Sequence, residues 1–155
     1  MTDVQTPVTQ ALDALAIPYT LHLHKEPIRS LEQAAAARGL QPAQIVRSLL
    51  FRMEDSAFVL LLMPGPDPVD WPKLRHYLRV SRITTATEEE VRQVTGFVPG
   101  AVSPFGLEQP LPLLADRAIL DLETISLGAG IRNAGVVLAR AEAMAALQPD
   151  LGEFK

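Results

Sequence analysis

The sequence predicts a mixed α/β fold, and three features of its pattern support this prediction. Helical and extended segments alternate along the whole chain. Two adjacent runs, residues 45–52 and 57–63, are apolar on both faces, which is typical of strands covered on each side by helices or by a second sheet. Capping residues precede several of the helical segments. The order of the segments favours mixed strand connections over a regular βαβ repeat.

The N-terminal quarter predicts a helix, a strand and a second helix. Thr6 and Pro7 fit an N-cap followed by proline, and apolar residues recur at helical spacing, so residues 7–16 are expected to be helical. Apolar and polar residues then alternate over residues 19–24, which predicts a half-buried strand. Ser30 and Gln33 form a capping-box pattern for an alanine-rich helix that Gly39 can close.

The central runs 45–52 and 57–63 are expected to form a hairpin joined by residues 53–56. Asp70 is the predicted cap of a helix that extends through Leu78. Thr87 and Glu90 form a capping box for another helix, which ends near Gly96. The remaining elements expected are strands at 111–115, 123–127 and 135–139 and a helix at 140–147.

Length and composition indicate one soluble domain spanning residues 1–155. The chain is 155 residues long, with 48% hydrophobic and 21% charged residues, which excludes wholesale disorder. The longest apolar run, residues 57–63, is far shorter than the about twenty residues of a membrane span. Residues 1–7 lack the basic and apolar regions of a secretory signal, so a cytoplasmic location and no membrane partner are expected.

The residue inventory excludes several chemistries. The chain contains no cysteine, which excludes thiol nucleophiles, disulfides and thiolate metal sites. His22 and His24 lie two residues apart, but no third ligand follows at a recognisable spacing, so exposed strand histidines are favoured over a metal site. No nucleophile elbow, zinc-protease motif or kinase motif is present. We therefore expect neither a metal nor a cofactor.

The charge is unevenly distributed. The net charge of −4 argues against a protein that wraps long duplex nucleic acid. Residues 73–82, however, carry four basic residues and no acidic one: Lys73, Arg75, Arg79 and Arg82. This basic segment could contact a few phosphates, or it could be a solvated helix face.

Arg47 breaks the pattern of its predicted strand. It shares one face with apolar residues, and the other face is also largely apolar. An unpaired buried charge is costly, so Arg47 is expected either to form an internal ion pair or to line a cleft that receives an anion. Its planar guanidinium suits a phosphate or a carboxylate.

Two glycine-containing segments are candidate ligand loops. Residues 96–106 contain five glycine or proline residues, and such a loop can form an ordinary connection, an anion-binding nest or an oxyanion hole. Residues 128–133 have neither a P-loop lysine nor the full dinucleotide fingerprint, so a tight turn between strands is favoured there.

Several stretches together resemble the YbaK/prolyl-tRNA synthetase editing-domain family of aminoacyl-tRNA deacylases. The matching stretches are residues 17–22, 44–50, 95–106, 111–116 and 128–130. The most specific of them is the Thr-Gly-x-x-x-Gly-x-x-Ser-Pro-x-Gly pattern that begins at Thr95. The resemblance extends over residues 7–147, nearly the whole chain.

The resemblance implies a compact, strongly bent mixed sheet approaching a barrel, with helices around it. It also implies hydrolysis, in trans, of the ester of a mischarged tRNA, such as alanyl- or cysteinyl-tRNA(Pro), with a synthetase as a further partner. By family position, the expected catalytic residues are Arg47, Gly100 and Ala101. The expected substrate-binding residues are Tyr19, Ser48, Gly96, Phe97, Pro99, Ser103, Gly128 and Gly130. The basic segment is our own candidate for tRNA phosphates, on the basis of its charge alone.

The sequence departs from the family pattern at three positions. The usual lysine falls at Arg47, and arginine cannot act as a base because it stays protonated. A serine or another polar residue is common where Gly128 stands, and an aspartate where Gly135 aligns. These departures leave two hypotheses: a trans-editing deacylase, or a non-catalytic binder of aminoacyl-tRNA or of an aminoacyl-nucleoside. A third hypothesis, that the chain is an interaction subunit for a synthetase, is supported by no sequence feature of its own.

Overall fold

The structure of the chain is a computed structural model that describes residues 4–155. The helices are α1 (Pro7–Ala14), α2 (Leu31–Ala37), α3 (Trp71–Leu78), α4 (Glu88–Thr95) and α5 (Arg140–Leu147). The strands are β1 (Tyr19–Leu23), β2 (Val46–Met53), β3 (Phe58–Pro64), β4 (Ile83–Thr85), β5 (Leu113–Asp116), β6 (Thr124–Gly128), β7 (Ala134–Ala139) and β8 (Asp150–Gly152). Three short 3₁₀ turns are η1 (Pro42–Gln44), η2 (Glu54–Ser56) and η3 (Arg117–Asp121). Residues 1–3, which belong to the stretch that lacks a signal sequence, lie outside the described residues.

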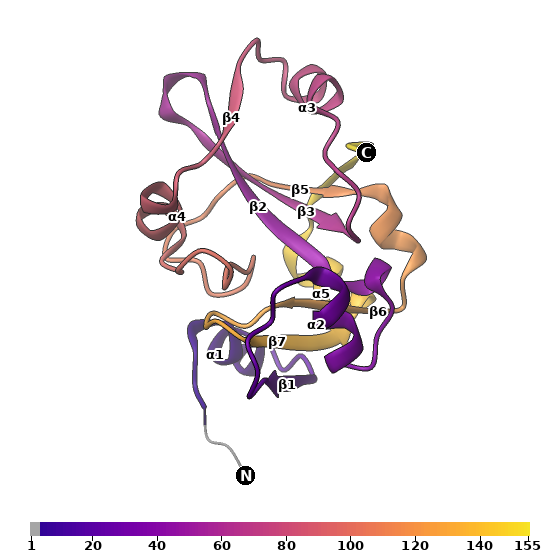
Figure 1. Ribbon diagram of the computed structural model, residues 1–155. Helices are drawn as coiled ribbons and strands as arrows, with labels where there is room; N and C mark the ends of the chain where they lie inside the picture. Colours follow the sequence, from indigo (N-terminus) through magenta and orange to yellow (C-terminus); the bar gives the residue numbers. More distant parts are fainter. Residues whose placement is uncertain (1–3) are drawn as a thin grey trace.

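The larger of two sheets has the strand order β4-β2-β3-β5-β8. The predicted central hairpin is confirmed, because β2 and β3 pair antiparallel with Leu50 opposite Leu60. β5 and β8 add parallel to the other side of β3. The long strands β2 and β3 cross the centre of the molecule, with α3 and α4 on opposite sides of them in this view (Figure 1). β4 and β8 were not predicted, since three-residue strands are too short to show a periodic pattern.

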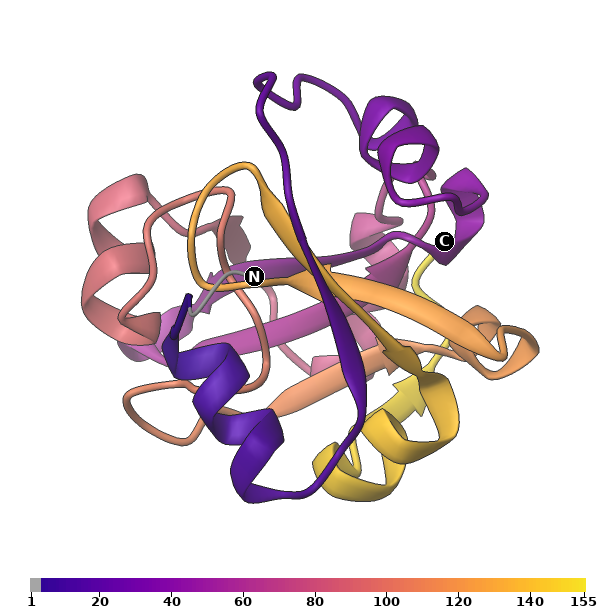
Figure 2. The ribbon, with the colours of Figure 1, turned by 90° about the horizontal axis from the view of Figure 1, so that it is seen from below.

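The smaller sheet has the order β1-β7-β6 and is antiparallel throughout. One parallel bridge, between Ile45 and Ser126, joins it to the larger sheet. Its strands cross those of the larger sheet (Figure 2). Leu62 and Ala115 of the larger sheet share one buried cluster with Ile125 and Val136 of the smaller one. The predicted mixed α/β class is therefore confirmed, and the bent sheet consists of two sheets with the main core between them.

The predicted caps explain where most helices begin. Thr6, Ser30, Asp70 and Thr87 each accept a hydrogen bond from a backbone N–H in the first turn of α1, α2, α3 and α4. The Glu90 carboxylate in turn accepts a hydrogen bond from the Thr87 N–H, which completes a capping box. α1 ends at Ala14, two residues earlier than predicted. No helix within residues 4–155 is long and apolar enough to cross a membrane.

Candidate active site

Two cavities lie next to each other along β2, and together they form the candidate site. The first, here called the arginine cavity, has a volume of about 420 Å³ and is lined by α2, β2, β6 and the loop after α4. The second, the apolar cavity, has a volume of about 370 Å³ and lies between β2, α3 and α4. Both are lined by Ser48, Leu49, Gly100 and Val102. These shared residues make the two cavities neighbours in one groove.

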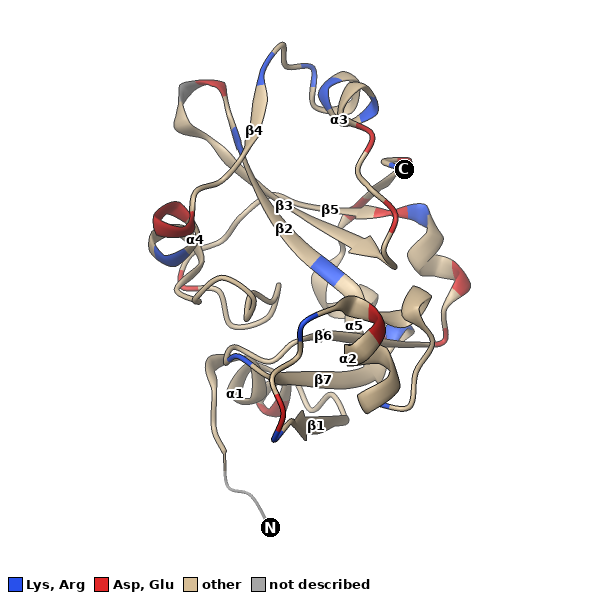
Figure 3. Ribbon diagram, in the orientation of Figure 1, with Lys and Arg blue, Asp and Glu red and all other residues tan. Residues whose placement is uncertain are grey.

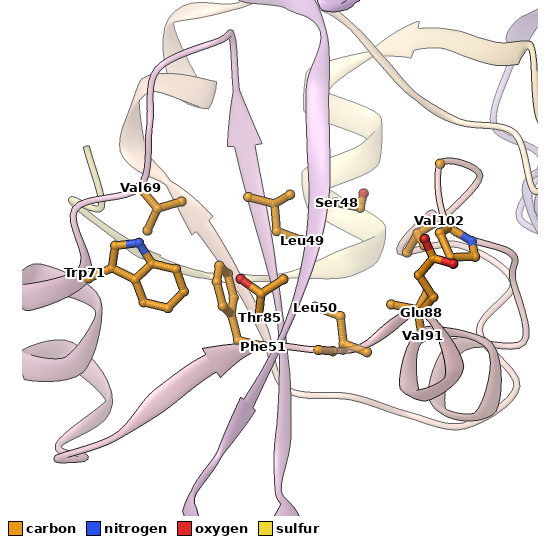
Figure 4. Close-up of a pocket in the computed structure, with 13 residues that line it drawn as sticks. Ser48, Leu49, Leu50, Phe51, Val69, Trp71, Thr85, Glu88, Val91 and Val102 are labelled. Atoms are coloured by element: carbon orange, nitrogen blue, oxygen red, sulfur yellow. The ribbon is translucent and has the colours of Figure 1, made fainter. Parts of the chain in front are cut away.

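Trp71 and Phe51 form the aromatic part of the apolar cavity. Their rings meet edge to face, with centroids 5.2 Å apart. Trp71 and Val69 lie at one end of the cavity and Glu88, Val91 and Val102 at the other, with the β2 side chains between them (Figure 4). Because Asp70 caps α3, the helix starts with its indole at the cavity wall. A flat, apolar group can therefore be held here against an aromatic face.

Arg47 lies on β2 and lines the arginine cavity. It donates a hydrogen bond to the backbone carbonyl of Asp67, while its Nε is buried and has no hydrogen-bond partner. Burial lowers the pKa of Arg47, and the nearby Asp67 carboxylate opposes this shift. That carboxylate pairs with Lys155 at 3.2 Å. Of the two expectations for Arg47, the cleft is the one observed, and Arg47 forms no ion pair with the side chains of residues 4–54 and 56–155.

A second arginine, Arg38, lines the same cavity. It is the C-cap residue of α2, and its guanidinium donates to His24 Nε2 at 3.1 Å, to Ser126 Oγ at 3.0 Å and to the Ala134 carbonyl at 3.2 Å. The three acceptors are an imidazole nitrogen, a hydroxyl and a backbone carbonyl, and none of them is a carboxylate. Burial lowers the pKa of Arg38. Two half-buried arginines, Arg38 and Arg47, therefore line the arginine cavity.

The loop at residues 96–106 has a fixed path. Gly96 ends α4 in the left-handed conformation, and the Ser103 hydroxyl, which is fully buried, accepts from the Phe105 N–H. At the groove, Gly100 is exposed with a φ of +88°, and the space where a Cβ would lie is open. The Ala101 N–H already donates to the Val98 carbonyl. Of the two expected loop residues, Gly100 is exposed, with open space at its Cβ position, and the Ala101 N–H is engaged in the turn.

The end of β6 holds this loop in place. A Cβ at Gly128 would lie 2.2 Å from the Val102 carbonyl oxygen, so this close approach requires glycine. Two residues later, the Gly130 N–H donates to the Ala101 carbonyl at 3.1 Å. Glycine is required at position 135 for a similar reason, because a Cβ there would lie 2.3 Å from the Arg38 guanidinium carbon. Two of the three departures from the family pattern thus fit the local packing of this chain.

The structure brings together only part of the predicted site. Arg47, Ser48, Gly100 and Gly128 line the arginine cavity, and Pro99 lines the apolar cavity with Ser48 and Gly100. Six other predicted residues do not line either cavity. Phe97, Ala101 and Ser103 are buried in the core, Gly96 and Gly130 are turn residues, and Tyr19 lies against α1. For Tyr19, burial and then Asp13 raise the pKa of the phenol.

The basic segment, residues 73–82, forms most of α3 and the turn after it, and α3 begins at Trp71, which lines the apolar cavity. Lys and Arg residues mark α3, and acidic residues mark the first turn of α4 (Figure 3). Lys73 Nζ donates to the Lys155 carbonyl at 2.7 Å, so this lysine is partly engaged. Glu54 accepts from the Ser81 and Arg82 backbone N–H groups, which fixes the turn after α3.

Sequence reasoning missed Arg38, Trp71 and Ser126. The first follows an alanine-rich helix, where a basic residue is ordinarily a solvated C-terminal residue. The second is the chain's one tryptophan and stands beside the predicted cap Asp70, which is a signal that could have been used. The third is fully buried on β6, and its contact with α2 depends on packing between distant segments.

Comparison with known proteins identifies the class to which this fold and groove belong. Residues 25–145 match the model of the aminoacyl-tRNA editing domain. The chain therefore belongs to the aminoacyl-tRNA editing domain family.

Individual relatives agree with this assignment. The chain is similar to proline–tRNA ligases of Bacillus licheniformis (33% identity over 107 residues, 69% of this chain and 18% of the ligase) and Streptococcus thermophilus (35% over 101 residues, 65% and 16%). It thus spans less than a fifth of the length of these relatives. It also resembles a crystal structure described as a candidate trans-editing enzyme for prolyl-tRNA synthetase, with a TM-score of 0.86, 29% identity and coverage of 96% of this chain and 94% of that one.

Proposed function

We propose that this chain is a trans-acting deacylase that hydrolyses the ester of a mischarged aminoacyl-tRNA, with errors of prolyl-tRNA synthetase such as alanyl- or cysteinyl-tRNA(Pro) as the first candidates. One observation carries the proposal: the exposed Gly100 backbone lies where the arginine cavity and the apolar cavity meet. Such editing is useful because one small side-chain difference gives a synthetase only about 1–3 kcal/mol of discrimination.

The apolar cavity suits the nucleoside end of an aminoacyl-adenosine. We assign the adenine ring to this cavity, where Trp71 offers an aromatic wall. The ester then lies beside Gly100, where the two cavities meet. In this arrangement the Gly100 N–H is the candidate donor to the carbonyl oxygen as negative charge develops on it. Contacts of the basic segment with tRNA phosphates are part of the same proposal.

The chemistry assigned to the groove is attack by water. None of the residues that line the arginine cavity is a cysteine, histidine or carboxylate, and a guanidinium stays protonated. The water oxygen bonds to the ester carbon, and the bond from that carbon to the ribose oxygen breaks. The water proton passes to the departing ribose oxygen, with the neighbouring ribose hydroxyl of the substrate as the relay. The protein contributes position, charge and the exclusion of bulk water.

The proposal is tested by a deacylation time course on a panel of mischarged tRNAs. We compare the wild type with Arg47→Ala and Arg47→Lys, and use Arg117→Ala, an exposed position away from both cavities, as the control. Hydrolysis by the wild type and the control, with loss in Arg47→Ala, is the expected result. An intact panel at high protein concentration overturns the proposal.

A non-catalytic binder is the second candidate, and the absence of a base among the residues lining the arginine cavity favours it. In that case the wild type binds an aminoacyl-adenosine analogue without hydrolysing any ester, and activity emerges in Arg47→Lys. Turnover by the wild type that disappears in a folded Arg47→Ala variant excludes this candidate.

A further inference from the structure

The arginine cavity has two cationic residues and no carboxylate in its lining. Arg38 and Arg47 line it, and none of its lining residues is aspartate or glutamate. Among the described side chains, those of residues 4–54 and 56–155, the ion pairs are Arg52 with Glu90 and Lys155 with Asp67, so neither cavity arginine takes part in one of these. Two like charges held in a partly desolvated site raise its free energy, and this cost falls when an anion enters.

Arg38 is held in position and keeps donors to spare. A guanidinium has five N–H groups, and three of those of Arg38 bond to His24, Ser126 and Ala134. Two N–H groups remain for a ligand. Because Gly135 has no side chain, the guanidinium can occupy the space where a Cβ would otherwise lie. The surrounding strands are therefore shaped around this cation.

Arg47 and Ser48, which both line this cavity, each carry a polar atom without a partner. Arg47 Nε and Ser48 Oγ are both buried and have no hydrogen-bond partner within the described part of the chain. Buried polar atoms are ordinarily satisfied by protein or by a ligand. The Asp67 carboxylate affects Arg47 from outside the lining of the cavity and is itself paired with Lys155.

We propose that the arginine cavity binds an oxyanion, a carboxylate or a phosphate group of the substrate, between Arg38 and Arg47. The inference rests on the proposed function and narrows its substrate class. A free ammonium group is repelled from this cavity by both guanidiniums. The substrate therefore places there either the carboxylate of an acidic acyl group or a phosphate of the nucleotide end. The second source is compatible with a neutral acyl group such as alanine.

Binding is measured first, without any turnover. Inorganic phosphate and succinate are titrated into the protein, and affinity is followed by calorimetry and by amide shifts at Ser48 and Ser126. We expect both anions to bind, and Arg38→Gln and Arg47→Gln each to weaken binding by about tenfold or more. Arg117→Gln is the matched control and binds as the wild type does. Lack of binding, or equal binding by all four proteins, overturns the inference.

The source of the anion is then decided with acylated RNA ends. A glutamyl ester is compared with the isosteric, neutral glutaminyl ester. Faster hydrolysis of the glutamyl ester, lost in Arg38→Gln, supports the inference and identifies the acyl carboxylate. Equal rates, with inorganic phosphate competing against the uncharged RNA end, support it and identify the phosphate. If anions bind but no ester of the panel is cleaved, the oxyanion site stands and the deacylase proposal fails.

Discussion

Arg38 donates from its Nε to the Nε2 atom of His24 at 3.1 Å, and this bond joins the end of α2 to the residue after β1. An imidazole that accepts at Nε2 is neutral and carries its proton at Nδ1. Burial, the charge of Arg38 and then His22 all lower the pKa of His24. The pair thus keeps one face of the arginine cavity free of an extra positive charge from His24.

This arrangement predicts the titration of His24. Its pKa is expected to lie below 6.5 in the folded protein, and Arg38→Gln is expected to raise it. Because the folded pKa is lowered, the unfolded chain binds the proton first. The contribution of His24 to stability is complete above the unfolded value near 6.5 and is lost as the pH falls through the folded pKa. NMR of the histidine Cε1 protons measures the shift, with Arg117→Gln as the control. An unchanged titration in Arg38→Gln contradicts the prediction.

Trp71 provides an optical signal for the apolar cavity. It is the only tryptophan in the chain, and it lines the cavity assigned to the adenine ring. Titration with adenosine monophosphate is therefore expected to quench or shift the emission, because the ring stacks on or near the indole. Val69→Asp, at the same end of the cavity, is expected to weaken the effect, and Arg117→Gln is expected to leave it unchanged. Saturating nucleotide without any spectral change would count against the assignment.

Phe154 anchors the C-terminal segment to α3. Its side chain is 0% exposed and meets Tyr77 edge to face at 5.1 Å. Its N–H donates to Asp116 and its carbonyl accepts from the Asp70 N–H. We expect Phe154→Ala to lower the free energy of unfolding by about 3–5 kcal/mol. Urea denaturation checks this against Leu120→Ala, an exposed position expected to change by less than about 0.5 kcal/mol. Similar losses in the two variants would disprove the anchoring role.

Gly128→Ala tests the contact between β6 and the loop at residues 96–106. The new Cβ lies 2.2 Å from the Val102 carbonyl oxygen, so the loop must move. A destabilisation of about 1–3 kcal/mol is expected, together with amide shifts at Gly100 and Val102. Gly39→Ala is the comparison, because its φ of +70° is strained but its Cβ meets nothing within 4 Å. It should lose stability without shifting the loop amides; identical loop spectra for the two variants would refute the contact.

The basic segment is tested through salt dependence. If Arg75 and Arg82 contact tRNA phosphates, their replacement by glutamine weakens binding for all tRNAs and lowers the slope of log affinity against log salt by about one for each contact. Lys73→Gln is expected to have a smaller effect because Lys73 Nζ already bonds to the Lys155 carbonyl. Arg117→Gln keeps the wild-type slope. If the variant with both Arg75→Gln and Arg82→Gln keeps the wild-type slope of log affinity against log salt, these residues belong to a solvated helix face.

Local interactions explain what the sequence could predict about the fold. The caps at Asp70 and Thr87 depend on residues three positions apart, and the β2–β3 hairpin depends on two apolar runs with a short connection. These elements were predicted with small errors at their ends. The two short strands β4 and β8 were missed, because their pairing comes from distant partners rather than from their own pattern.

The fold class, the family and the candidates Arg47, Ser48 and Gly100 could be predicted from the sequence, because each depends on a local pattern or on an uninterrupted motif. Which candidates share a cavity depends on the tertiary structure. Arg38 and Arg47 line the same cavity, Tyr19, Phe97 and Ser103 line neither, and the close approach of Val102 requires glycine at position 128. The physical reason is that cavities form where segments far apart in the chain meet, and the charge and space there depend on side chains that no single segment contains.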